Sequence, residues 1–151
     1  MKEYKSTIPE ITLKYKSGDT KKIKVTSSKG AADYMRELYD MDTIEITESA
    51  ICLFLNRANN SIGWFKVSQG GMTGTVIDVK LILIAALKCG AQAIILSHNH
   101  PSGQLRASDA DLRITRKLNE ACKILDISLL DHVIITNEGY LSFSDEGLLY
   151  G

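Results

Sequence analysis

A short apolar run that ends in two histidines decides the fold of this chain. Residues 93–103 read Ala-Ile-Ile-Leu-Ser-His-Asn-His-Pro-Ser-Gly. The four apolar residues at 93–96 are typical of a strand that is buried on both faces in the middle of a sheet. Pro101 has no amide hydrogen and a fixed φ, so the chain cannot continue there as a regular helix. We therefore expect His98 and His100 to lie where a central strand ends and the chain leaves the sheet.

The segments on both sides of this strand predict an α/β domain. Residues 76–88 predict a long apolar helix, and Gly90 is placed as its C-terminal stop. A strand, a helix and a strand in this order indicate a parallel crossover unit. The other predicted elements are a helix over 31–39, paired strands over 49–55 and 61–67, a helix over 108–125, a strand over 128–136 and a closing hairpin strand over 140–143. We expect a mixed central β-sheet flanked by helices.

The N-terminal residues carry a different pattern. Residues 11–16 and 22–26 alternate apolar and polar side chains around a Ser-Gly-Asp turn, which predicts a β-hairpin. We therefore divide the chain into an N-terminal β-hairpin extension, residues 1–27, and a main domain, residues 28–151. The lysines at positions 14, 16, 21, 22 and 24 are expected to form a solvated face, with a binding patch as the alternative. The edge strands of such a hairpin could support a homodimer.

Composition limits the classes of function. The chain has 151 residues, 44% of them hydrophobic, and its 18 basic residues balance 18 acidic ones. It therefore lacks the basic character of a typical nucleic-acid binder. The N-terminus has no apolar signal segment, and the longest apolar run, 81–87, is too short to span a bilayer. The three cysteines are far apart and predict buried free thiols. We expect a cytoplasmic protein without a membrane segment.

The two histidines and a following helix start predict a zinc site. Side chains at positions i and i+2 of an extended segment point the same way, so His98 and His100 can reach one ion. Ser108 can cap the next helix, with Asp111 at its third position in a capping box. The helix dipole keeps a carboxylate there ionised, as a metal ligand must be. Two imidazoles and one carboxylate hold zinc and leave a position for water. Asp109, the competing carboxylate, is interpreted as a helix-start charge.

A hydrolytic site also needs a general base. The candidates include Glu45, Glu48 and Glu138, and spacing alone does not choose among them. Glu48 directly precedes an apolar strand, so it can lie at a sheet end. The third histidine, His132, is interpreted as hydrogen-bonded at a strand start, and a second metal or a substrate contact is the alternative.

Together these residues resemble a known motif. Glu48, His98-x-His100-Pro-Ser-Gly and Ser108-x-x-Asp111 look like the JAMM motif of the JAB/MPN metalloproteases. More closely, the chain resembles the RadC-like proteins, which are often labelled DNA repair proteins. The segments that match the family are residues 48–56, 69–75, 94–103 and 130–135, and the similarity covers about residues 25–149.

The resemblance implies a zinc-dependent metallopeptidase or isopeptidase with a cytidine-deaminase-like JAB/MPN fold. His98, His100 and Asp111 would hold Zn²⁺, and Glu48 would deprotonate a water at the fourth position and pass the proton to the leaving amine. Ser108 would help to stabilise the oxyanion. The substrate would be a protein or peptide that the motif does not identify.

Two other functions are compatible with parts of this pattern. One is a non-catalytic DNA-repair or recombination accessory module that retains the metal for structure. Structural zinc sites normally close with four protein ligands, so three ligands and a glutamate favour catalysis. RadC-like proteins usually begin with a helix-hairpin-helix region, whereas residues 1–30 predict a β-hairpin, so direct DNA binding is not expected. The other is a deaminase, but the His-x-Glu and Pro-Cys-x-x-Cys signature is missing from the sequence.

Overall fold

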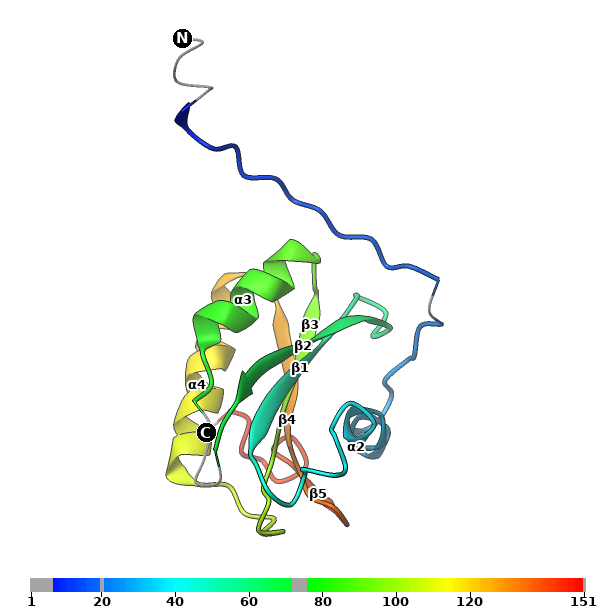
Figure 1. Ribbon diagram of the computed structural model, residues 1–151, viewed down its shortest axis with the longest axis vertical. Helices are drawn as coiled ribbons and strands as arrows, with labels where there is room; N and C mark the ends of the chain where they lie inside the picture. The colour runs from blue at the N-terminus through cyan, green and yellow to red at the C-terminus, as the bar shows by residue number, and fades with distance from the viewer. Residues whose placement is uncertain (1–6, 20, 72–75, 151) are drawn as a thin grey trace.

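The computed structural model describes residues 7–19, 21–71 and 76–150, and element labels follow Figure 1. Its main sheet has five strands in the order β2-β1-β3-β4-β5, with β3 at the centre. In chain order the elements are α2 (Ser28–Arg36), β1 (Ser49–Leu55), β2 (Ser61–Gln69), α3 (Val79–Lys88), β3 (Ala93–Asn99), α4 (Asp109–Ile124), β4 (Ser128–Ile135) and β5 (Tyr140–Ser142). The predicted order of helices and strands in the main domain is thus confirmed, with shifts at some ends.

The sheet is mixed, as the sequence predicts. Strand β1 runs antiparallel to both β2 and β3, while β3 and β4 are parallel neighbours joined through α4. Because β2 and β3 are both antiparallel to β1, they run in the same direction, and α3 connects them across β1. Figure 1 shows α3 and α4 together on one face of the sheet and α2 on the other. The chain therefore has the α/β class with helices on both sheet faces.

Strand β3 separates the core into two halves. All seven of its residues are buried. The apolar run predicts this for residues 93–96, and the strand extends three polar residues further, to Asn99. Ile94 and Leu96 belong to the cluster that includes residues of α3 and α4, and Ile95 belongs to the cluster that includes residues of α2. Since side chains alternate between faces along a strand, His98 projects on the α4 side and Asn99 on the α2 side. The two polar residues at the end of β3 therefore lie on opposite faces of the sheet.

The central strand is expected to carry much of the stability. Ile94 is 0% exposed, whereas Ile124 at the end of α4 is 82% exposed. Ile94→Ala should lower the free energy of unfolding by about 3 kcal/mol, because it removes buried methyl groups and leaves a cavity. The same change at Ile124 should stay within about 0.5 kcal/mol of the unaltered chain. Urea unfolding followed by circular dichroism measures both, and equal losses would contradict this description of the core.

The predicted N-terminal hairpin is wrong for the described residues. No strand joins residues 11–16 to residues 22–26; residues 1–6 and 20 lie outside the described part. Instead, Lys24 forms an isolated bridge with Asn60, beside the start of β2. Alternation shows that a segment can be a strand, but a two-stranded hairpin is marginal without a surface to pack on. Ile11, at 89% exposed, has no such surface. The division of the chain after residue 27 stays a prediction.

Two further expectations concern membranes and cysteines. Among the described residues, no helix has the length and apolar character required to cross a membrane. Cys52 and Cys122 are buried, Cys89 is partly buried, and all three are free thiols. Of residues 69–75, one of the segments that carry the family resemblance, the structure describes only those up to residue 71.

Candidate metal centre

Strands β1 and β3 bring a glutamate and two histidines to the same end of the sheet. Ala50 lies opposite His98 in the antiparallel register, so Glu48 lies beside the residues that end β3. Glu48, His98 and His100 each offer a ligand atom within 4.8 Å of the others, a grouping that could hold a metal ion. Residues about fifty positions apart in the sequence therefore share one site because two strands are neighbours.

Asn99 attaches the segment before β1 to the end of β3. Its side-chain oxygen accepts a hydrogen bond from the amide of Ser49 at 2.7 Å. Its side-chain nitrogen donates to the carbonyls of Ile44 at 2.8 Å and Thr47 at 2.9 Å. Asn99 is 1% exposed, so these bonds are protected from water. Sequence reasoning missed this residue, although an asparagine between two candidate ligands was a signal. Asn99 thus holds the backbone of Thr47 and Ser49, the two neighbours of Glu48, and its side chain lies on the face of β3 opposite His98.

The carboxylate of Asp111 completes the cluster from the start of α4. The Nε2 atoms of His98 and His100 are 2.9 Å apart. Asp111 Oδ1 lies 3.3 Å from His98 Nε2, and Asp111 Oδ2 lies 3.5 Å from His100 Nε2. Ligand atoms about 2.0–2.1 Å from a tetrahedral zinc ion stand about 3.3 Å from one another. The separations among the three side chains, 2.9–3.5 Å with each histidine facing a different oxygen of Asp111, are thus close to the spacing of zinc ligands.

Asp111 is held by the capping box that the sequence predicts. Its amide donates to the Ser108 hydroxyl oxygen at 3.0 Å, and its Oδ2 accepts from the Ser108 amide at 2.9 Å. Burial opposes ionisation of Asp111, but the hydrogen bonds to His100 and His98 outweigh it and hold the pKa of Asp111 well below its usual range. Asp111 is therefore a carboxylate at neutral pH, whereas Asp109 is exposed at the first residue of α4.

His100 presents one nitrogen toward the cluster. Its Nδ1 lies 2.8 Å from the carbonyl oxygen of Gln104, and since a carbonyl only accepts, this nitrogen donates. A neutral His100 therefore has its lone pair on Nε2, which faces His98. Burial lowers the pKa of His100, but the bonds to Asp111 and Gln104 and the charges of Asp111 and Glu48 raise it above its ordinary value overall. His100 Nε2 therefore faces two carboxylates, those of Asp111 and Glu48, which favour a positive charge on the ring.

The structure separates the three candidate bases. Glu48 Oε1 lies 4.0 Å from His100 Nε2. Glu45 and Glu138 instead line a separate cavity of about 160 Å³, together with the turn that follows His100. Of these three carboxylates, only that of Glu48 belongs to the group with His98 and His100 that is found among the described residues. Its role as a base stays a prediction, as does the role of Ser108 in oxyanion stabilisation.

His132 lies behind His98 in the core, in β4. It is 0% exposed and stacks on Phe143, with ring centroids 4.4 Å apart. Its Nε2 is 2.7 Å from His98 Nδ1, and its Nδ1 is 2.6 Å from Thr115 Oγ1. Burial, followed by the electrostatic interaction with His98, lowers the pKa of His132 well below its ordinary value. The expected hydrogen-bonded histidine is confirmed, within the strand rather than at its start.

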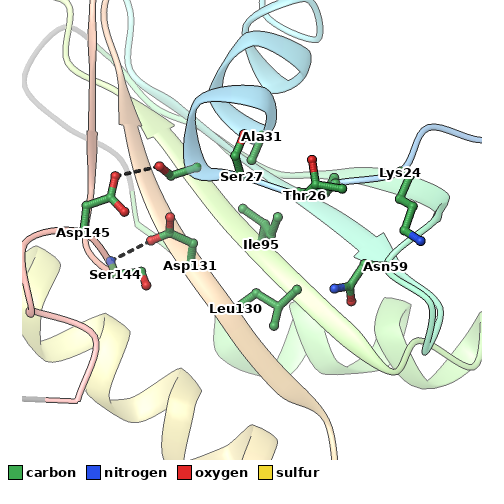
Figure 2. Close-up of a pocket in the computed structure, with 12 residues that line it drawn as sticks. Lys24, Thr26, Ser27, Ala31, Asn59, Ile95, Leu130, Asp131, Ser144 and Asp145 are labelled. Atoms are coloured by element: carbon green, nitrogen blue, oxygen red, sulfur yellow. Dashed lines mark hydrogen bonds between the residues drawn. The ribbon is translucent and has the colours of Figure 1, made fainter.

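A cavity of about 420 Å³ lies on the opposite face of the sheet, beside α2 (Figure 2). Asp131 and Ile95 line it, and Asp131 accepts from the Ser144 amide at 2.9 Å. Neighbouring residues in a strand point to opposite faces, so Asp131 projects away from the side of His132. This cavity is therefore separate from the histidine cluster.

The fold and this cluster define an α/β domain with a candidate metal site at the end of its central strand. The family model described as the RadC-like JAB domain matches residues 25–148, and the chain belongs to that family. The resemblance seen in the sequence is therefore confirmed, and with it the JAB type of fold.

Several relatives are called UPF0758 proteins. The relative from Flavobacterium johnsoniae is 43% identical over 141 residues, which cover 92% of this chain and 60% of the relative. The relative from Aquifex aeolicus is 34% identical over 140 residues, which cover 93% of this chain and 58% of the relative. The relative from Porphyromonas gingivalis is 45% identical over 98 residues, which cover 64% of this chain and 43% of the relative. The chain thus spans 60% or less of the length of these relatives, and their names state no activity.

Proposed function

We propose that this chain is a zinc-dependent hydrolase of the JAMM type that cleaves an amide bond in a protein or peptide. One observation carries the proposal: two imidazole nitrogens and the Asp111 carboxylate lie 2.9–3.5 Å from one another, close to the spacing of zinc ligands, with a second carboxylate beside them. A structural zinc site would normally close with four protein ligands. The second carboxylate is instead suited to proton transfer.

The proposal assigns His98, His100 and Asp111 as the zinc ligands. Asp111 fits better than Glu48 as the third ligand, because its contacts with the histidines are 3.3 and 3.5 Å, whereas the contact of Glu48 is 4.0 Å. The longer separation leaves Glu48 adjacent to the ion rather than bound to it. When bound, zinc would polarise the scissile carbonyl and make water acidic near neutral pH.

Glu48 is the general base in this proposal. Its carboxylate takes a proton from the attacking water and delivers it to the leaving amine, which needs that proton to depart. The buried bonds of Asn99 to the chain before β1 keep the Glu48 backbone at the end of β3. A well-positioned base of this kind contributes on the order of 10²–10⁴-fold in rate.

Ser108 is the oxyanion donor in this proposal. Its hydroxyl oxygen accepts from the Asp111 amide at 3.0 Å, an arrangement that leaves the hydroxyl hydrogen to donate. A donor aimed at the oxygen of the tetrahedral intermediate lowers the barrier because negative charge develops there. The exposure of Ser108 at the start of α4 suits contact with a substrate.

Metal removal tests the proposal as a whole. The chain, purified without chelating resin, should contain about one zinc per molecule by elemental analysis, because it has one three-ligand site. A chelator should abolish cleavage in a panel of peptide and isopeptide-linked substrates, and one equivalent of zinc should restore it. A zinc-loaded chain that cleaves none of them and binds DNA in a salt-dependent way would overturn the hydrolase and favour the accessory module.

A further inference from the structure

A buried row of hydrogen bonds leads from His98 back to the helix that carries Asp111. His98 Nδ1 meets His132 Nε2 at 2.7 Å, and His132 Nδ1 meets Thr115 Oγ1 at 2.6 Å. Thr115 Oγ1 then donates to the backbone carbonyl of Asp111 at 2.7 Å. His98, His132 and Thr115 are each 1% exposed or less, so water does not compete for these bonds.

The direction of every bond follows from the carbonyl at the end of the row. A carbonyl oxygen only accepts, and the Thr115 hydroxyl has a single hydrogen, which it gives to Asp111. The Thr115 oxygen must therefore accept from His132, so the hydrogen of His132 sits on Nδ1. The helix thus determines the tautomer of a histidine in the neighbouring strand.

The same reasoning extends to His98. His132 is fully buried, and within the described part of the chain its two ring nitrogens meet His98 and Thr115 rather than a carboxylate. A charged ring there would be costly, so the neutral ring is the stable form. With its hydrogen on Nδ1, its Nε2 can only accept, and His98 Nδ1 must donate to it. The lone pair of a neutral His98 is then on Nε2, the nitrogen that faces His100 and Asp111.

We infer that His132 and Thr115 are positioning residues that hold His98 in the tautomer required of a metal ligand. Partners of this kind orient ligating histidines and commonly change metal affinity by about 10–100-fold when they are removed. The inference rests on the metal site of the proposed function but not on hydrolysis. The inference also explains why a polar residue, His132, lies within the apolar core.

The first test is the position of the ring hydrogens in the metal-free chain. Two-bond proton–nitrogen correlation spectra distinguish the two tautomers of a histidine, and the chain has three histidines. The expected result is a hydrogen on Nδ1 in both His98 and His132. A hydrogen on Nε2 of His132 would overturn the inference. This measurement uses the unaltered chain and needs no bound zinc, so it remains informative if the proposed function fails.

The second test compares two substitutions at one position that touches no metal. Thr115→Val keeps the shape of the side chain but removes the acceptor for His132, whereas Thr115→Ser keeps the hydroxyl. Competition with a chromogenic chelator should show zinc binding about 10–100-fold weaker in Thr115→Val, and near that of the unaltered chain in Thr115→Ser. The same spectra should show the ring hydrogen of His132 leaving Nδ1 only in Thr115→Val.

The two tests separate the failures of the two proposals. Equal zinc affinity in both Thr115 variants, with both folded by circular dichroism, would overturn the positioning role while leaving the metal site intact. An unaltered chain that binds no zinc at all would overturn the metal site, and the tautomers would still report on the hydrogen-bond row. If Thr115→Val does not fold, the spectra of the unaltered chain decide.

Discussion

Glu48→Gln should retain about one zinc per chain and lose on the order of 10²–10⁴-fold of its hydrolytic rate. The amide has nearly the shape of the carboxylate but cannot accept the proton of the attacking water. Binding of the ion should survive, because the three proposed ligands are unchanged. Elemental analysis and the rate of cleavage of a peptide substrate, measured on the same preparation, give the two quantities.

Glu45→Gln is the matched control for this variant. Glu45 lies three residues earlier and lines the separate cavity beside the turn after His100, so its rate should stay near that of the unaltered chain. A Glu48→Gln protein that has lost its zinc would show instead that Glu48 is a ligand, and a variant that cleaves at the unaltered rate would remove Glu48 from the chemistry.

His100→Ala should reduce bound zinc from about one ion per chain to nearly none. A site with three protein ligands that loses one nitrogen retains two, which is fewer than zinc sites use. His100 is half-buried and follows β3, so its loss should disturb the fold less than the loss of His98, which is 1% exposed inside the core. Elemental analysis after dialysis measures the zinc, and circular dichroism confirms that the variant is folded.

A second pair of variants tests the carboxylate ligand in the same assay. Asp111→Asn should also lose most of the zinc, because a neutral amide is a poor ligand for a cation. Asp109→Asn makes the same change at the exposed first residue of α4 and should keep it. If both variants retained zinc, Asp111 would not be a ligand, and Glu48 would become the candidate for the third position.

The parts of the site that are local in the sequence could be predicted from it. The i, i+2 spacing of His98 and His100 and the capping box of Ser108 and Asp111 depend on a few consecutive residues, and both are present in the structure. The central strand could also be predicted, because a run of apolar residues is typical of a strand that is buried on both faces.

The parts that depend on distant partners could not be predicted by spacing. The contact between His98 and His132 joins residues 34 positions apart, and that between Thr115 and His132 joins residues 17 apart. Each requires the register of β3 against β4 or the placement of α4 over the sheet. The N-terminal hairpin was wrong for a related reason: alternation at 11–16 describes the segment but not what it pairs with.

The capping box at the start of α4 has a thermodynamic consequence. Ser108 and Asp111 close the first turn of the helix with the same carboxylate group that faces the two histidines. Fraying of that turn would therefore displace a proposed ligand, and an ion held by that ligand would oppose fraying. Metal affinity and local helix stability become linked quantities, so part of the free energy of binding appears as protection of this turn against opening.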